Sequence, residues 1–178
     1  LQFARGIPKL PTPKGENVVI ITGAGGSGVL LSDACVDNGL KLMRMPKDLD
    51  TAFRKFIPPF GAAGNPVDIT GGEPPQTYAN TIKLGLEDER IHALILGYWH
   101  TIVTPPMVFA KLTAEVVQAA RKKGIDKPVV ASLVGDVEVE EASEYLYERD
   151  IVAYPYTTEL PVNVLGAKYR WARSAGLL

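Results

Sequence analysis

The stretch VVIITGAGGSG, residues 18–28, decides the fold of this chain. Its first five residues form an apolar, β-branched run without alternation, which is typical of a strand covered on both faces. The glycine-rich segment GAGGSG follows at once, and residues 29–37 then carry apolar side chains at helical spacing up to Asn38-Gly39. A buried strand that runs through glycines into a helix is the first unit of a parallel sheet.

The same alternation of strand and helix continues outward from this stretch. We expect further strands at residues 40–43, 93–96, 128–133 and 152–154, and helices at residues 47–56, 77–86, 106–123, 137–149 and 160–174. This pattern predicts an α/β fold with three layers, in which a doubly wound, parallel, five-stranded sheet has the flavodoxin-like order 2-1-3-4-5. Residues 1–15 contain three prolines and predict a linker, so the domain is expected to cover residues 16–178.

Composition and charge exclude several classes of function. The 178 residues fit one domain, and 19 Lys and Arg against 20 Asp and Glu give a net charge of -1. We therefore expect no nucleic acid and no membrane as partner. Cys35 is the single cysteine, which indicates a reducing, cytoplasmic setting and a buried packing thiol. One cysteine and two histidines provide no zinc-ligand spacing, so no metal site is expected.

The glycine-rich segment allows three interpretations. Backbone N–H groups at Gly25, Gly26, Ser27 and Gly28 can approach an anion at the positive end of the following helix, and this phosphate-binding interpretation is favoured. The segment also matches the dinucleotide motif G-x-G-x-x-G, but the next strand ends at Met43-Arg44, where that motif requires an acidic residue. The third interpretation is a tight turn that permits close packing. No G-K-[ST] follows, which excludes a Walker loop.

Two other loops carry candidate residues. In the sequence Asn-Pro-Val-Asp, Asn65 and Asp68 either brace the glycine loop or form a plain turn with a capping aspartate. Tyr98, Trp99 and His100 follow the third predicted strand, at the edge of the sheet where such folds bind ligands. They either line a pocket for a small acid or acyl group or form a partly buried aromatic cluster. His100 has no carboxylate partner nearby in the sequence.

Three segments together resemble the NDP-forming acyl-CoA synthetases of the succinyl-CoA synthetase superfamily. They are TGAGGSGVLLSD at residues 22–33, GNPVD at residues 64–68 and LGLEDERIHALIL at residues 84–96. The resemblance extends from about residue 15 to residue 165 and is to the second of two flavodoxin-like CoA-ligase domains. It implies that residues 1–15 are the linker from a preceding domain.

The resemblance implies an acid–thiol ligase in which an acid, CoA and a nucleoside triphosphate give acyl-CoA, a nucleoside diphosphate and phosphate through a phosphohistidine. The phosphate is then held between two helix N-termini, one of which begins at residues 25–28. Thr22, Tyr98, Trp99 and His100 are implied to line the acid pocket, and Asn65 and Asp68 to support the loop. No catalytic residue is expected in this chain, because neither histidine lies in a segment like Ser-His-Thr-Gly.

The resemblance also implies the cofactors and partners. The parent enzyme would use ATP or GTP, Mg and CoA, whereas this domain alone would bind no cofactor and would be inactive. The implied partners are a phosphohistidine ligase domain, a CoA-binding domain and an ATP-grasp domain, together with phosphate and a small carboxylic acid. The alternatives are a non-catalytic, CoA-ligase-like interaction or regulatory module, and a free-standing flavodoxin-like cofactor binder.

Overall fold

A parallel sheet forms the centre of the molecule in the computed structural model, which describes residues 2–178. Its strands are β1 (Asn17–Thr22), β2 (Lys41–Leu42), β3 (Val67–Asp68), β4 (Ala93–Trp99), β5 (Val129–Val134) and β6 (Val152–Pro155). The order is β2-β1-β4-β5-β6, and β3 also pairs with β1. The predicted α/β class and the order of the five predicted strands are confirmed, and β3 is a sixth strand that the sequence analysis did not predict.

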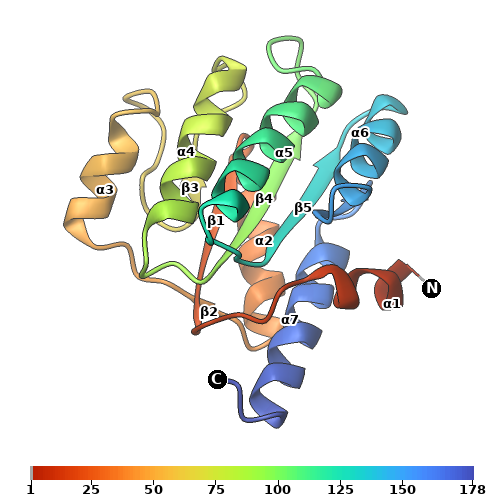
Figure 1. The fold of residues 1–178 in the computed structure, drawn as a ribbon. Coiled ribbons are helices and arrows are strands. Elements are labelled where there is room, and N and C mark those ends of the chain that lie inside the picture. Colours follow the sequence, from red (N-terminus) through yellow and green to blue (C-terminus); the bar gives the residue numbers. More distant parts are fainter. Residues whose placement is uncertain (1) are drawn as a thin grey trace.

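Helices cover both faces of this sheet (Figure 1). They are α2 (Gly25–Asp37), α3 (Lys47–Arg54), α4 (Pro75–Glu87), α5 (Pro106–Lys122), α6 (Glu138–Tyr147) and α7 (Glu159–Ser174). One face carries α3, α4, α5 and α6, which pack side by side, and the other carries α2 and α7. The three layers follow from right-handed crossovers between parallel strands, which place helices on both sides of the sheet.

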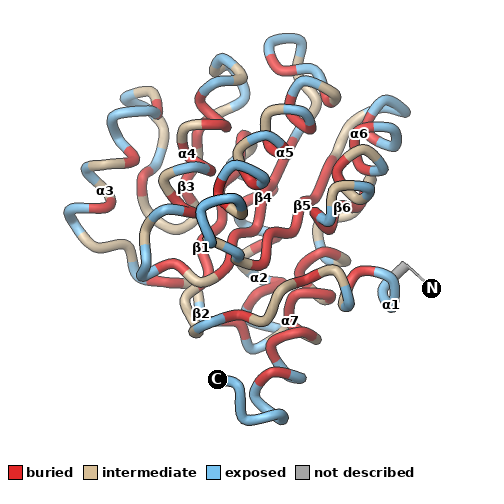
Figure 2. Tube along the Cα trace, viewed as in Figure 1, coloured by how far each residue is buried: buried red, intermediate tan, exposed pale blue. Residues whose placement is uncertain are grey.

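The side chains of β1 explain why its sequence shows no alternation. Val19 and Ile21 lie in the apolar core beneath α3 to α6, whereas Val18 and Ile20 lie in the core beneath α2 and α7. All four side chains are fully buried. In Figure 2 the central strands are buried along most of their length, while the outer surfaces of the helices are exposed. A strand buried on both faces needs apolar residues at every position.

The N-terminal segment contains more regular structure than its prolines predict. A short helix, α1 (Gln2–Gly6), is followed by a 3₁₀ turn, η1 (Ile7–Lys9). Pro8 is tolerated because it lies at the start of η1, where no intrahelical N–H bond is required. The three prolines therefore do not exclude helical structure from the start of this segment. Its role as a linker from a preceding domain stays a prediction.

Candidate functional site: the N-terminus of α2

The first turn of α2 presents unpaired backbone donors at the carboxyl edge of the sheet. Ala24 is the N-cap residue, and no side chain caps this helix in the part of the chain that the structure describes. The first intrahelical bond runs from the Gly28 N–H to the Ala24 carbonyl at 3.0 Å. The N–H groups of Gly25, Gly26 and Ser27 precede this bond and have no helical acceptor. They lie at the positive end of the helix dipole.

The glycines of this turn serve different purposes. A Cβ on Gly26 would meet nothing within 4 Å, so the space in front of this residue is open. A Cβ on Gly28 would lie 3.0 Å from Thr22 Cγ2 and 3.3 Å from Pro66 Cβ. Gly28 is therefore needed for the close approach of α2 to β1, and its N–H is already bonded. The expectation that the Gly28 amide contacts phosphate is corrected by this geometry.

A cavity of about 620 Å³ opens in front of this turn. Gly26, Ser27, Leu30, Trp99 and Tyr156 are among its lining residues. Ser27 is only 6% exposed, yet its hydroxyl has no hydrogen-bond partner among the described residues. Because a buried hydroxyl without a partner is costly, this arrangement suits a polar ligand in the cavity.

Thr22 stabilises the glycine loop from behind. Its buried hydroxyl accepts a hydrogen bond from the Ala24 N–H at 3.1 Å and donates one to the Ala24 carbonyl at 3.0 Å. The adjacent Gly23 N–H donates to the Gly97 carbonyl at 3.1 Å, which ties the loop to β4. Thr22 thus orients the start of α2 and is absent from the lining of this cavity.

The three predicted residues after the third strand separate in the structure. Trp99 is half exposed and lines the cavity. Tyr98 is fully buried on the other side of β4, where its ring stacks on Phe109 with centroids 4.5 Å apart. The expectation that Tyr98 lines the pocket is not met, because successive strand residues point to opposite faces.

His100 also lies outside the cavity lining. Its Nε2 lies 3.3 Å from Glu138 Oε2 at the start of α6. The sequence analysis found no carboxylate partner because Glu138 is distant along the chain. The fold brings the two together where β4 and β5 end side by side.

Asn65 fills a gap along the edge of β1. The strand β2 pairs with β1 only at Asn17 and Val18, and β3 only at Ile21 and Thr22. Between them, Asn65 Oδ1 accepts from the Ile20 N–H at 3.0 Å, and Asn65 Nδ2 donates to the Val18 carbonyl at 2.8 Å. The amide side chain therefore replaces a missing strand neighbour just below the glycine loop.

Asp68 lies beside the first glycine of α2. A Cβ on Gly25 would lie 2.9 Å from Asp68 Oδ2, so the carboxylate approaches the backbone there. Its other oxygen, Oδ1, accepts from the Thr70 N–H at 2.9 Å. Asp68 is thus held by its own loop and does not cap α2. The bracing role predicted for the loop stays a prediction that this geometry permits.

Several lining residues were not singled out from the sequence. Tyr156 and Thr158 follow β6, and Leu30 lies on the first turns of α2. The same rule that places ligands beyond the carboxyl ends of strands would have indicated Tyr156, had it been applied to the last strand as well as to the first and third. Leu30 gave no signal, because an apolar residue in a predicted helix is normally assigned to the core.

Two further features concern metal ions and membranes. The described residues include no group of three or more His, Cys, Asp or Glu placed to hold a metal ion. Within residues 2–178, no helix combines the length and the apolar character needed to cross a membrane.

Fold and site together define a three-layer α/β domain with an uncapped helix at an open cavity, and the chain belongs to the Ligase-CoA domain family, which matches residues 18–178. The chain is 37% identical over 171 residues to the alpha subunit of the ADP-forming acetate–CoA ligase I of Pyrococcus furiosus. That alignment covers 96% of this chain and 36% of the relative. The predicted resemblance to NDP-forming acyl-CoA synthetases is confirmed.

Solved structures show the same relationship. The apo form of the dinucleotide-forming acetyl-coenzyme A synthetase 1 of Candidatus Korarchaeum cryptofilum superposes with a TM-score of 0.91 at 35% identity, covering 99% of this chain and 38% of that one. The same synthetase in complex with phosphate and ADP has a TM-score of 0.90 at 34% identity, covering 99% and 37%. The chain thus spans between a third and two fifths of the length of these relatives.

Proposed function

We propose that this chain is the phosphate-holding ligase domain of an ADP-forming acyl-CoA synthetase. Such an acid–thiol ligase converts a carboxylic acid, CoA and a nucleoside triphosphate into acyl-CoA, a nucleoside diphosphate and phosphate. The family membership and the relatives named above support this assignment. The chain's own contribution is to bind the phosphoryl group during its transfer.

The observation that carries the proposal is the set of unpaired donors at the start of α2. Three N–H groups, at Gly25, Gly26 and Ser27, lack helical acceptors, and the buried Ser27 hydroxyl lacks a partner in the described structure. All four groups can donate a hydrogen bond to an anion. Donors of this kind, together with the helix dipole, stabilise a phosphoryl group without supplying a nucleophile.

Other steps of the reaction belong to other parts of the synthetase. We assign the phosphorylated histidine to a second ligase domain, CoA to a CoA-binding domain, and nucleotide with Mg to an ATP-grasp domain. Trp99, at the cavity wall, is proposed to contact the small carboxylic acid. Thr22 and Tyr98 support this wall from behind, and His100 flanks it beside Glu138.

Titration with inorganic phosphate tests the proposed site. We expect saturable shifts in the amide resonances of Gly25, Gly26 and Ser27. Ser27→Ala should weaken phosphate binding by about tenfold, because hydrogen bonds to charged groups contribute about 1.5–3 kcal/mol. Ser32→Ala is the matched control, since the Ser32 hydroxyl bonds the Gly28 carbonyl within the same helix. Unmoved amides at tens of millimolar phosphate would contradict the proposal.

Phosphoryl transfer in the complete synthetase separates this function from that of a non-catalytic module. If α2 holds the transferred phosphate, Ser27→Ala lowers the rate of transfer while the assembled enzyme stays intact. If the domain is a purely structural module, Ser27→Ala should instead reduce the amount of assembled enzyme. The rate of phosphoryl transfer per assembled enzyme should then stay the same. Labelled phosphate transfer and size-exclusion chromatography on the same samples distinguish the two outcomes.

A further inference from the structure

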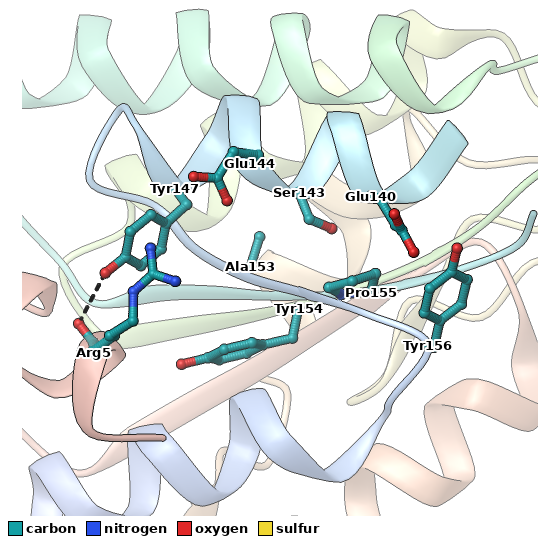
Figure 3. A pocket seen from close by; sticks show the side chains of 9 residues that line it. All are labelled: Arg5, Glu140, Ser143, Glu144, Tyr147, Ala153, Tyr154, Pro155 and Tyr156. Atoms are coloured by element: carbon teal, nitrogen blue, oxygen red, sulfur yellow. Dashed lines mark hydrogen bonds between the residues drawn. The ribbon is translucent and has the colours of Figure 1, made fainter. Parts of the chain in front are cut away.

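A second cavity, of about 430 Å³, lies between α6, β6 and the N-terminal helix α1 (Figure 3). Its walls carry three phenol rings, two carboxylates and one guanidinium group. These belong to Tyr147, Tyr154, Tyr156, Glu140, Glu144 and Arg5. Nothing in the phosphate chemistry proposed above uses this cavity, although Tyr156 lines both.

Ser143 provides an unsatisfied polar group on the wall of this cavity. Its side chain is 3% exposed, and its hydroxyl has no hydrogen-bond partner within the described chain. Figure 3 shows it between Glu140 and Glu144, with the hydroxyl directed away from α6 toward β6. A buried hydroxyl that lacks a partner points to a missing ligand atom.

The side chains that line this cavity carry more negative than positive charge. Glu140 and Glu144 lie one helical turn apart, a spacing at which like charges repel. None of the ion pairs formed by the described residues includes either of them. Partial burial and the neighbouring Glu140 carboxylate raise the pKa of the Tyr156 phenol, so this ring stays neutral. Among the residues that line the cavity, two carboxylates therefore face one guanidinium, that of Arg5. The nearby Lys9 ammonium does not line the cavity and is paired with Asp150.

The aromatic wall already accepts cations. The Arg5 guanidinium lies 4.6 Å from the centroid of the Tyr147 ring, and the Lys9 ammonium lies 4.4 Å from it. The Tyr147 hydroxyl donates to the Arg5 carbonyl at 3.2 Å, which fixes α1 at this end of the cavity. Figure 3 shows the Tyr156 ring beside Glu140, whereas the Tyr154 ring extends toward Arg5 at the other end of the cavity.

From these observations we propose that the cavity binds a small organic cation with an ammonium or guanidinium group. The cation sits against the exposed Tyr156 ring, its N–H groups donate to Glu140 and Glu144, and the Ser143 hydroxyl accepts one further hydrogen bond. Carboxylates combined with aromatic faces are the chemistry that recognises such cations. The site shares the Tyr156 ring with the cavity in front of α2, but it does not depend on the function proposed for that cavity.

Titration with n-butylammonium, and with n-butanol as its neutral isostere, tests this proposal at constant ionic strength. We expect n-butylammonium to give saturable amide shifts at Ser143, Glu144 and Ala153 in the millimolar range, and n-butanol to give none. Glu140→Gln and Glu144→Gln should each weaken binding about threefold, because each removes one partner of an exposed, screened ion pair. Added salt should weaken it further.

Glu141→Gln is the matched control, because Glu141 is exposed on the same helix and does not line the cavity. It should bind n-butylammonium like the unchanged protein. Circular dichroism on every variant confirms that α6 is retained. Equal binding of n-butanol and n-butylammonium, or undiminished binding by the double variant Glu140→Gln/Glu144→Gln, overturns the proposal.

Discussion

Two glycines in the same helical turn are expected to respond oppositely to the same substitution. Gly28→Ala places a methyl group 3.0 Å from Thr22 Cγ2 and 3.3 Å from Pro66 Cβ, so these side chains or α2 must shift to make room for it. We expect a loss of about 1–3 kcal/mol in the free energy of unfolding, the usual range for overpacking. Gly26→Ala meets no atom within 4 Å and should leave stability unchanged or slightly raised. Urea denaturation of both variants measures the difference, and equal stability would show that the close packing at Gly28 is not needed.

Individual residues at the carboxyl edge of the sheet could be predicted only in part. The glycine-rich segment was recognisable because glycine, strand and helix follow each other directly in the sequence. The split between Tyr98 and Trp99 was not, because the run ALIL that precedes them is buried on both faces and hides its alternation. Only the observed extension of β4 to Trp99 shows which of the two aromatic rings faces the cavity.

At the level of secondary-structure elements, part of the backbone hydrogen bonding of β1 is provided by the side chain of Asn65. Asn65→Ala removes the bonds to the Ile20 N–H and to the carbonyls of Val18 and Met43. The Val18 carbonyl keeps its bond from the Met43 N–H at 3.0 Å, whereas the Ile20 N–H loses its side-chain acceptor. Since an unpaired buried backbone group costs about 1–3 kcal/mol, we expect a loss of about 2 kcal/mol in the free energy of unfolding. Asn80→Ala is the control, because among residues 2–178 the Asn80 side chain bonds only to the exposed Gln76 side chain. It should change stability by less than about 0.5 kcal/mol. A similar effect of both substitutions in thermal unfolding would argue against the bracing of β1 by Asn65.

The elements that sequence analysis missed are the shortest ones. β3 has two residues and lies in a loop rich in glycine and proline, where no hydrophobic period can develop. Its pairing with β1 is fixed by tertiary contacts around Asn65 and not by local preference. α1 has only five residues and precedes the prolines, so it is too short to show a helical period. The longer helices and strands were predictable because each is long enough to show its period or its buried run.

For the molecule as a whole, Lys127 makes the free energy of unfolding depend on pH in the alkaline range. Its ammonium group is partly buried at the amino edge of the sheet and donates to the Asp88 carbonyl at 2.6 Å. Burial lowers its pKa from 10.5 to about 8. Between about pH 8 and pH 10.5 the Lys127 side chain is protonated in the unfolded chain and neutral in the folded chain. The folded protein then no longer buries a charge, so its free energy of unfolding rises with pH in this range.

Lys127→Met tests this dependence, because methionine has a similar length and never carries the charge. We expect the unchanged protein to gain about 1 kcal/mol in the free energy of unfolding relative to the variant between pH 7 and pH 10, after allowance for partial exposure. Comparing the two proteins cancels the titration of the tyrosines and of Cys35. If urea denaturation gives both proteins the same change in the free energy of unfolding between pH 7 and pH 10, the lowered pKa of Lys127 is contradicted.

Exposed apolar side chains surround the cavity in front of α2. Leu30, Trp99 and Ile102 are exposed around the cavity or on the loop that follows β4, and Ile102 is 99% exposed. Sequence analysis could assign these residues to a strand end and a helix, but not to a surface, because exposure is decided by how all the elements pack. Exposed apolar residues beside an open polar site are typical of a surface that another domain covers.

Ile102→Asp tests whether a second domain of the proposed synthetase covers this surface. The substitution should leave the thermal unfolding of this domain unchanged, because the side chain has almost no contacts to lose. In the complete synthetase it should lower phosphoryl transfer about tenfold, as burial of a charge at a domain contact costs more than 1.4 kcal/mol. Leu177→Asp is the control, since Leu177 is also exposed but follows α7 at the C-terminal end of the chain (Figure 1). If both variants transfer phosphate at the rate of the unchanged enzyme, the surface stays open during the reaction, and the oxyanion is then held by α2 without a facing domain.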